Sequence, residues 1–365
     1  MLSEILLALL LFYFHINYFF SSLLALLPLR SSGHAPGKAP KVSIIITTHN
    51  EESVIEPTLR SAAALDYPDF EIIIVDSSSD RTPEIARKYG RVIRDRARKG
   101  KPHALNLGVR AAKGEVLYIL DADSLPEKGA LRKLVAALQT HDVATGINIL
   151  QNKQSFTARI ARLQVALFNA LEIIGYNIVG TVMLAGKNFA IKKETLKKMG
   201  HFSHELAEDV DLSLRLYDAG KTVALVDAFC FEQAPPYLSW YLKQQRRWIL
   251  GGGKEVLEFF GKADLGRVLF LGPLGVSLAF SHIFALVFLL HFLATGSALA
   301  LGGFILTGLI YVIAAARFLD ADDVLLAPVT MLALGALQLY VIVSSLAAKL
   351  GGAEIKWEKT PKVKN

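Results

Sequence analysis

Cysteine and charge are the two features that this chain has least of. A single cysteine, Cys230, among 365 residues excludes an internal disulfide framework and agrees with a reducing compartment. Charged residues make up 20% of the chain, below the roughly 25% of an average soluble domain. Charge is absent altogether from three blocks, at 5–29, 268–316 and 324–348. Such long apolar blocks beside ordinary mixed sequence exclude a disordered protein, a collagen and a disulfide-rich toxin.

The uncharged blocks predict membrane-embedded segments, because about 20 apolar residues cross a bilayer core. Block 5–29 predicts one transmembrane helix. Block 268–316 is long enough for two, with a break offered at Gly296-Ser297 or Gly302-Gly303. A buried core helix is the alternative, but core helices of this length usually carry a polar face.

Flanking charges predict the orientation of the first segment. Arg30, Lys38 and Lys41 follow it, whereas only Glu4 precedes it. The positive-inside rule therefore predicts an integral protein of the cell membrane with its soluble domain in the cytoplasm. With membrane segments present, the net charge of +7 favours lipid headgroups and a phosphate-bearing substrate, and we expect no nucleic-acid partner.

Block 324–348 has two interpretations. If it crosses the membrane, the tail from Lys349 onward, with its five lysines, lies outside, against the positive-inside rule. If it lies in the interface or re-enters, the tail stays on the cytoplasmic side. Pro328, Gly335 and Gln338 favour the second interpretation.

The region between the blocks alternates apolar β-branched runs with helical stretches. Val42–Thr47, Glu71–Val75 and Val116–Leu120 read as strands buried on both faces, which predicts an α/β fold with a parallel sheet. Ligands bind at the carboxyl ends of such strands. We therefore expect a site built from Thr47–Glu51, Asp76–Asp80 and Asp121–Asp123.

Two carboxylate groups follow these strands. Asp121 and Asp123 are two residues apart, so in extended geometry they face the same way and suit Mg²⁺ or Mn²⁺. A solvated turn is the alternative. Asp76 stands where it could accept hydrogen bonds from a base or ribose, while Asp80 reads as a cap for the next helix.

Three further motifs carry charged or polar residues that could bind a substrate or act in catalysis. Gly100-Lys101 offers close backbone approach and a cation for a diphosphate, or else a basic surface loop. Glu208-Asp209 at a helix start could supply a general base, or a plain cap. Gln244, Arg247 and Trp248 could hold pyrophosphate and sugar, or form an interfacial helix.

In this order the motifs resemble the family 2 glycosyltransferases with a GT-A fold, in particular the membrane-bound branch of cellulose, chitin, hyaluronan and poly-N-acetylglucosamine synthases. The branch signature of Asp, Asp-x-Asp, Glu-Asp and Gln-x-x-Arg-Trp is matched by Asp76, Asp121-Ala122-Asp123, Glu208-Asp209 and Gln244-Gln245-Arg246-Arg247-Trp248. Gly100–Asn106 matches the family's Gly-Lys-x-x-Ala-Leu-Asn, and Thr47–Glu51 is similar to its Pro-Thr-Tyr-Asn-Glu with Pro and Tyr replaced. The resemblance covers about residues 41–260 and implies a Rossmann-like, mostly parallel GT-A domain.

The resemblance also implies a role for each matching residue. The uridine diphosphate of a nucleotide sugar would be held by Thr48, Glu51, Asp76, Lys101 and Asp121. Asp123 would bind the metal, and Asp209 would deprotonate the acceptor hydroxyl. The acceptor and the leaving diphosphate would contact Glu208, Gln244, Arg247 and Trp248. Single displacement on an α-linked donor would give a β-linkage.

The tail is similar to the gating loop of this branch, through Trp357, Lys359 and Thr360, with a solvated basic tail as the alternative. The acceptor is a growing polysaccharide or a lipid: the Gln-x-x-Arg-Trp motif favours processivity, whereas the few membrane segments favour a lipid. A metal-dependent nucleotidyltransferase and an inactive membrane scaffold are the competing function classes.

These inferences divide the chain into seven parts: transmembrane helix 1–29, linker 30–40, catalytic domain 41–236, amphipathic interface helix 237–262, two transmembrane helices 268–316, the third apolar segment 324–348, and a basic cytoplasmic tail 349–365.

Overall fold

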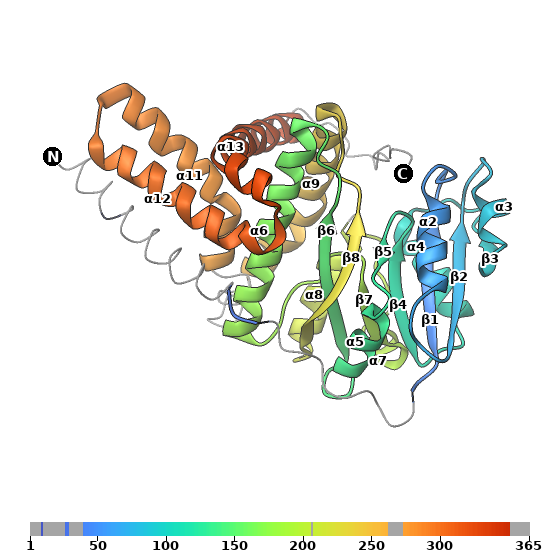
Figure 1. Ribbon diagram of the computed structural model, residues 1–365. Helices are drawn as coiled ribbons and strands as arrows, with labels where there is room; N and C mark the ends of the chain where they lie inside the picture. Colours follow the sequence, from blue (N-terminus) through green and yellow to red (C-terminus); the bar gives the residue numbers. More distant parts are fainter. Residues whose placement is uncertain (1–8, 10–25, 29–38, 206, 262–272, 351–365) are drawn as a thin grey trace.

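The computed structural model describes residues 9, 26–28, 39–205, 207–261 and 273–350 (Figure 1). An eight-stranded sheet with the order β3-β2-β1-β4-β7-β6-β8-β5 forms the centre of this part of the chain. Its strands are β1 (Val42–Thr48), β2 (Phe70–Asp76), β3 (Arg91–Arg94), β4 (Val116–Asp121), β5 (Leu125–Pro126), β6 (Val143–Leu150), β7 (Phe189–Lys192) and β8 (Val223–Glu232).

The sheet is mostly parallel, as the strand–helix alternation predicts. β1 pairs in parallel with both β2 and β4, and β6 pairs in parallel with β8. Only β7 and β5 run against their neighbours among the described strands. The α/β, Rossmann-like fold class expected from the sequence is therefore confirmed.

Helices cover both faces of the sheet because alternate strand residues point to opposite sides. Ile44 and Ile46 of β1 pack with Leu59 under α2, α3 and α5, whereas Ile45 packs with Leu105 under α4, α7 and α8. These helices are α2 (Ile55–Ala63), α3 (Thr82–Ala86), α4 (Lys101–Ala111), α5 (Ala130–Ala137), α7 (Lys193–Lys198) and α8 (Glu208–Asp218). At the start of α3, the expected Asp80 does accept the Thr82 amide at 3.0 Å, although the helix boundary falls at Arg81.

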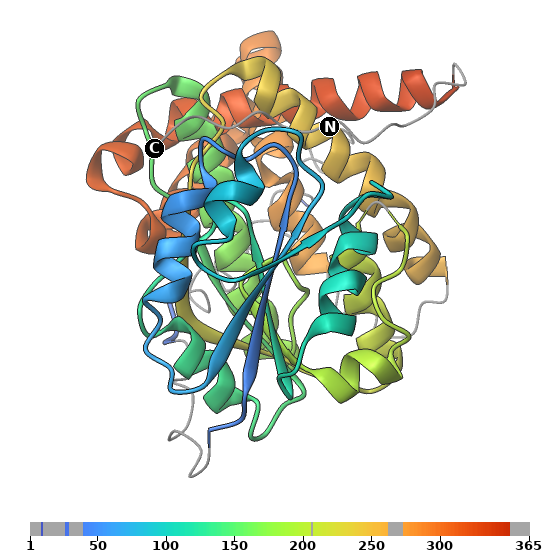
Figure 2. The same ribbon diagram turned by 90° about the vertical axis from the view of Figure 1, so that its right-hand side faces the viewer.

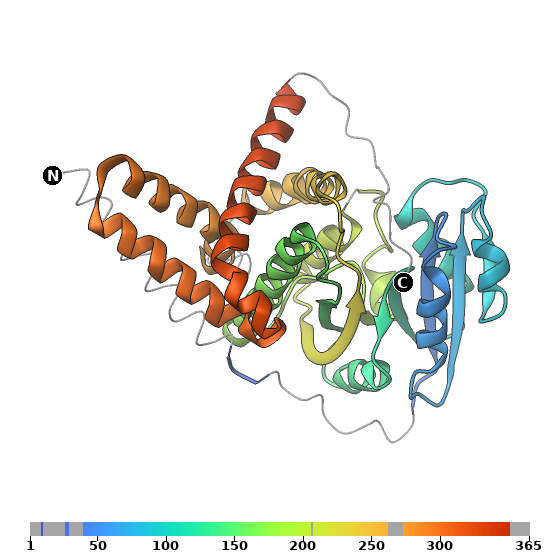
Figure 3. The same cartoon turned by 45° about the horizontal axis from the view of Figure 1, so that its top comes forward.

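A second, all-helical layer packs around a separate apolar core. It consists of α6 (Phe156–Val179), α9 (Leu238–Gly261), α11 (Pro273–Thr295), α12 (Ala298–Ala315), the short 3₁₀ helix η1 (Ala316–Phe318) and α13 (Ala321–Leu350). α11 and α12 form a hairpin that projects away from the sheet (Figure 3). The hairpin turns at Gly296, with φ +69°, and Ser297 caps α12; Gly302-Gly303, the other break offered by the sequence, lies inside α12.

Two helical segments of the described chain, Ala298–Phe318 and Ala321–Ala348, are long and apolar enough to cross a membrane by length and composition. They point in different directions, because α13 is seen nearly end-on where the α11–α12 hairpin runs across the view (Figure 1). α13 is a single helix with Pro328 inside it. It therefore contains no internal turn of the kind that a re-entrant segment needs.

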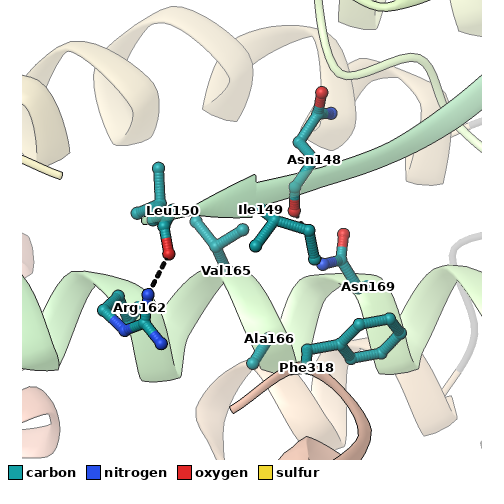
Figure 4. A pocket seen from close by; sticks show the side chains of 8 residues that line it. All are labelled: Asn148, Ile149, Leu150, Arg162, Val165, Ala166, Asn169 and Phe318. Atoms are coloured by element: carbon teal, nitrogen blue, oxygen red, sulfur yellow. Dashed lines mark hydrogen bonds between the residues drawn. The ribbon is translucent and has the colours of Figure 1, made fainter. Parts of the chain in front are cut away.

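A charge cluster joins α6 to the start of α13. Arg162 is buried and donates to Asp323 Oδ2 at 2.7 Å and to Asp320 Oδ2 at 3.0 Å. It also donates to the carbonyl oxygen of Leu150 at the end of β6, beside a small pocket between β6, α6 and Phe318 (Figure 4). The helical layer is thus tied directly to the sheet.

The acidic members of this cluster, Asp320, Asp322 and Asp323, lie close enough together to suit a metal ion. Their charge is already matched by Arg162, by Arg159 at 2.6 Å from Asp323 and by Lys153 at 2.8 Å from Asp322. The cluster is therefore a set of ion pairs.

Candidate active site

The predicted polar residues at the carboxyl ends of β1, β2 and β4 lie at the same edge of the sheet. Thr48 lies opposite Asp76 in the pairing of β1 with β2, and Thr47 lies opposite Asp121 in the pairing of β1 with β4. In Figure 2 these strands run upward, and α9 and α13 lie beyond their carboxyl ends. The site therefore faces the helical layer.

Asp76 is the centre of the first part of the site. It is fully buried and accepts a hydrogen bond from Thr48 Oγ1 at 2.8 Å. Arg94, from the neighbouring strand β3, pairs with its other carboxylate oxygen and donates to the carbonyl oxygen of Ser78 at 2.7 Å. The Asp76 carboxylate is thereby fixed in orientation.

Hydrogen bonds join the loops that follow β1 and β2. The Asn50 amide donates to Ser78 Oγ at 2.7 Å, and the Glu51 amide donates to Thr82 Oγ1 at 2.8 Å. Asn50 has φ +55°, and Glu51 is buried. Three of the residues predicted to bind the nucleotide, Thr48, Glu51 and Asp76, therefore belong to one rigid unit.

Lys101 connects the next two groups of carboxylates. Its Nζ lies 2.9 Å from Asp121 Oδ1 and 3.1 Å from Glu208 Oε1, and donates to the Gly186 carbonyl at 3.1 Å. Burial alone lowers the pKa of this lysine, but Asp121 and Glu208 outweigh burial and hold the pKa above its usual value. Lys101 therefore stays charged between the end of β4 and the start of α8.

Asp209 lies next to this lysine in the first turn of α8. Burial, together with the adjacent Glu208 charge, raises the pKa of Asp209 to about 6, although Lys101 opposes the shift. Its Oδ1 accepts from the Val210 amide at 3.0 Å. A carboxylate with a pKa of about 6 can both accept a proton and remain ionised near neutral pH, which suits a general base.

Asp123 occupies the turn after β4, beside a second lysine. Lys187 pairs with buried Glu232 at the end of β8, and Ser124 Oγ donates to Glu232 Oε1 at 3.4 Å. Burial raises the pKa of Glu232, with Lys187 opposing and Asp123 adding to the shift. Asp121 ends β4 whereas Asp123 lies in the turn, so the extended geometry expected for the pair is not present. Their carboxylate oxygens are hard ligands, and this donor chemistry fits Mg²⁺ or Mn²⁺.

The helix α9 carries Gln244, Arg247 and Trp248 and packs against α8 and α6. Trp248 faces α6, with its ring centroid 6.3 Å from that of Phe168. The neighbouring Gln245, buried, accepts from Gln164 at 2.8 Å and anchors the helix on the same side. The motif is therefore supported on α6 and adjoins the helix that begins with Glu208 and Asp209.

Comparison with known proteins finds similar sequences. Residues 43–200 match the family model described as "Glycosyl transferase family 2". This part of the chain is therefore similar to the family 2 glycosyltransferases. The structure of a mannosyltransferase from Pyrobaculum calidifontis, in complex with GDP-Man and Mn²⁺, has a TM-score of 0.63 and 23% identity over 96% of this chain and 98% of that chain, which shows the shared fold.

Two curated relatives align with part of the chain. "Probable glycosyltransferase YdaM" of Bacillus subtilis (strain 168) is 33% identical over 63% of this chain and 60% of its own length. The poly-beta-1,6-N-acetyl-D-glucosamine synthase of Staphylococcus epidermidis is 27% identical over 60% of this chain and 56% of its own length. The chain thus spans less than two thirds of the relatives it matches.

Two residues that adjoin the candidate site, Arg94 and Glu232, were missed by sequence reasoning. Glu232 is an acidic residue at the carboxyl end of a strand, as Asp76 and Asp121 are, but its strand β8 was not predicted. Arg94 carries no such signal, because only the strand order brings it to Asp76. The predicted gating residues Trp357, Lys359 and Thr360, and the predicted helix 1–29 apart from a few positions, lie outside the described residues.

Proposed function

We propose that this chain is a membrane-bound inverting glycosyltransferase that transfers a sugar from a nucleotide sugar, UDP-linked, to a hydroxyl group of a polysaccharide or lipid acceptor. The observation that carries the proposal is Lys101, whose ammonium group touches Asp121 on one side and Glu208 on the other. This contact supports the proposal, because the predicted donor residue Asp121 and the predicted base Asp209 are both neighbours of Lys101.

On the donor side, the Thr48–Asp76–Arg94 unit would bind the nucleoside, and Lys101 would pair with the diphosphate. The Lys101 side chain is paired with carboxylates but remains 26% exposed. An incoming diphosphate can therefore reach its ammonium group. Asp121 and Asp123 would hold Mg²⁺ or Mn²⁺, which would supply further positive charge to the departing diphosphate.

On the acceptor side, Asp209 would take the proton of the attacking hydroxyl group. The acceptor oxygen forms a bond to the anomeric carbon while the bond from that carbon to the phosphate oxygen breaks. The nucleoside diphosphate leaves with the electron pair, and the proton stays on the Asp209 carboxylate. Attack opposite the leaving group inverts an α-linked donor to a β-linked product. Glu208, Gln244, Arg247 and Trp248 would orient the acceptor.

The apolar helices of the described chain and the uncharged blocks of the sequence support a membrane location. We propose the cell membrane, with the catalytic domain on the cytoplasmic side. A cysteine placed at Lys362 tests the side of the tail, because native Cys230 is buried and gives little background. Protection from a membrane-impermeant label in intact cells supports this topology, and labelling contradicts it.

The direct test is UDP release by the purified full chain with UDP-glucose and UDP-N-acetylglucosamine, with GDP-mannose as a comparison donor. Asp209→Asn should abolish turnover and retain UDP binding. Asp211→Asn, two residues along α8 and paired with Arg215, is the matched control and should stay active. Equal turnover of Asp209→Asn and wild type would remove Asp209 from the mechanism, and no turnover with any donor would favour an inactive scaffold.

Product length distinguishes the two acceptor classes. A processive synthase yields a ladder of increasing sugar number from a radiolabelled donor, whereas a lipid glycosyltransferase adds one sugar to each acceptor. Release of pyrophosphate from a sugar phosphate and a nucleoside triphosphate would instead indicate a nucleotidyltransferase. Removal of divalent cations with a chelator should stop transfer, and Mn²⁺ or Mg²⁺ should restore it.

A further inference from the structure

The ion pair of Lys187 and Glu232 lies on the half of the sheet that the proposed mechanism leaves unused. Phe189 of β7 lies opposite Ile119 of β4, so Lys187, two residues before it, reaches the level of Asp121. Glu232 ends β8, opposite Leu150 at the end of β6. Both residues therefore stand on the same sheet edge as the catalytic carboxylates, on the side away from Thr48 and Asp76.

The pair is held firmly by its surroundings. Asn188, next to Lys187, accepts from Tyr118 at 2.9 Å and donates to the Ala228 carbonyl at 3.0 Å. The Glu232 backbone carbonyl accepts from the Gln151 amide at 2.9 Å. Glu232 is 5% exposed, whereas the Lys187 side chain is 22% exposed. The carboxylate of the pair is therefore buried, and its lysine is the member that is accessible from the site.

The position of the pair relative to the donor follows from the strand order. The nucleoside unit lies at β1 and β2, and the diphosphate residues Asp121 and Asp123 lie at the end of β4. The sugar of the donor is attached beyond the diphosphate, so it extends toward β7 and β8. That direction leads to Lys187. Burial lowers the pKa of this lysine, but the charges of Glu232, Asp121 and Asp123 hold it above its usual value.

We propose that Lys187 and Glu232 form the subsite that binds the ring hydroxyl groups of the transferred sugar. This inference rests on the proposed function. A hydroxyl group both donates and accepts, so an ammonium group beside a carboxylate satisfies a pair of neighbouring hydroxyl groups. Because the two charges already neutralise each other, the subsite takes a neutral hexose or N-acetylhexosamine in preference to a uronic acid.

Lys187→Met and Glu232→Gln test the subsite by two kinetic readouts. Hydrogen bonds to charged groups are the stronger class, so kcat/KM for the nucleotide sugar should fall on the order of tenfold or more. The inhibition constant of UDP alone should change by less than about threefold, since UDP lacks the sugar. Lys187→Arg should recover part of the loss, and Lys192→Met, at the opposite end of β7 and paired with Asp142, is the control.

Two results with these variants would overturn the assignment. If UDP binding weakens in step with kcat/KM, Lys187 acts on the diphosphate. If both constants stay unchanged, the pair does not touch the donor.

A second measurement needs no variant. The wild-type chain should lose on the order of tenfold in kcat/KM with at least one monodeoxy form of its donor sugar. Equal use of every deoxy donor contradicts the subsite. Absence of any wild-type transfer would instead contradict the proposed function itself.

Discussion

The Asp209 carboxylate lies directly against Gly186, so close that a side chain at Gly186 would displace it. A β-carbon built on Gly186 would stand 2.8 Å from Asp209 Oδ2 and 3.6 Å from Lys101 Nζ. Gly186 also has φ +71°, a conformation that glycine adopts without strain. One glycine therefore sets both the turn before β7 and the space around the proposed base.

Gly186→Ala should reduce kcat by on the order of a hundredfold, since a displacement of the base near 1 Å costs about that much. Gly180→Ala is the matched control: Gly180 has φ +77°, but its β-carbon would meet nothing within 4 Å. Both variants carry the backbone strain, and only the first disturbs Asp209. Equal activity of the two variants in the UDP-release assay would contradict the contact's importance.

The pKa of Asp209 predicts an acid limb in the pH profile of kcat. The base acts in its ionised form, so the rate should fall as the pH drops through about 6. Glu208→Gln removes a neighbouring negative charge that raises this pKa, and should move the limb to lower pH. Asp211→Asn serves as control and should leave the limb in place. A limb that stays fixed in Glu208→Gln would argue against Asp209 as the titrating group.

Arg94→Met should weaken UDP binding, because it leaves the fully buried Asp76 carboxylate without its cation. The Arg94 side chain is 41% exposed, so solvent screens part of the loss, and we expect about tenfold in the dissociation constant. Arg91→Met, at the other end of β3 and exposed, is the control. Calorimetric titration with UDP measures both; unchanged affinity in Arg94→Met would show that Asp76 does not depend on this arginine.

Arg162→Met should lower the free energy of unfolding, because it removes an ion pair between α6 and α13. Both Arg162 and Asp323 are almost completely buried, and severing a buried pair costs about 3–5 kcal/mol. Arg159 still pairs with Asp323, so we expect a smaller loss, on the order of 2–3 kcal/mol. The melting temperature in detergent measures this effect. Lys153→Met, in an exposed pair of the same cluster, should cost under about 1 kcal/mol, and equal losses would contradict the structural role of burial here.

Sequence patterns located β1, β2 and β4 and the acidic residues that follow them, since both are local signals. The run from Val42 to Thr47 is apolar and β-branched, and it forms a strand buried on both faces. Patterns did not locate β3 and β5, which are two to four residues long and have little periodicity to detect, nor the longer strands β6 and β8. Arg94, which pairs with Asp76, stands in one of these short strands.

What the sequence by itself determined is the kind of domain, the carboxylate positions at its strand ends, and the apolar blocks that predict membrane association. These follow from residue periodicity, which a short window of sequence contains. What only the tertiary structure decided is which of those residues meet. Lys101 reaches Asp121 and Glu208, Gly186 packs on Asp209, and Lys187 pairs with Glu232 because the strand order and register bring distant turns to one edge. Strand order depends on the packing of the whole sheet, so no local pattern encodes it.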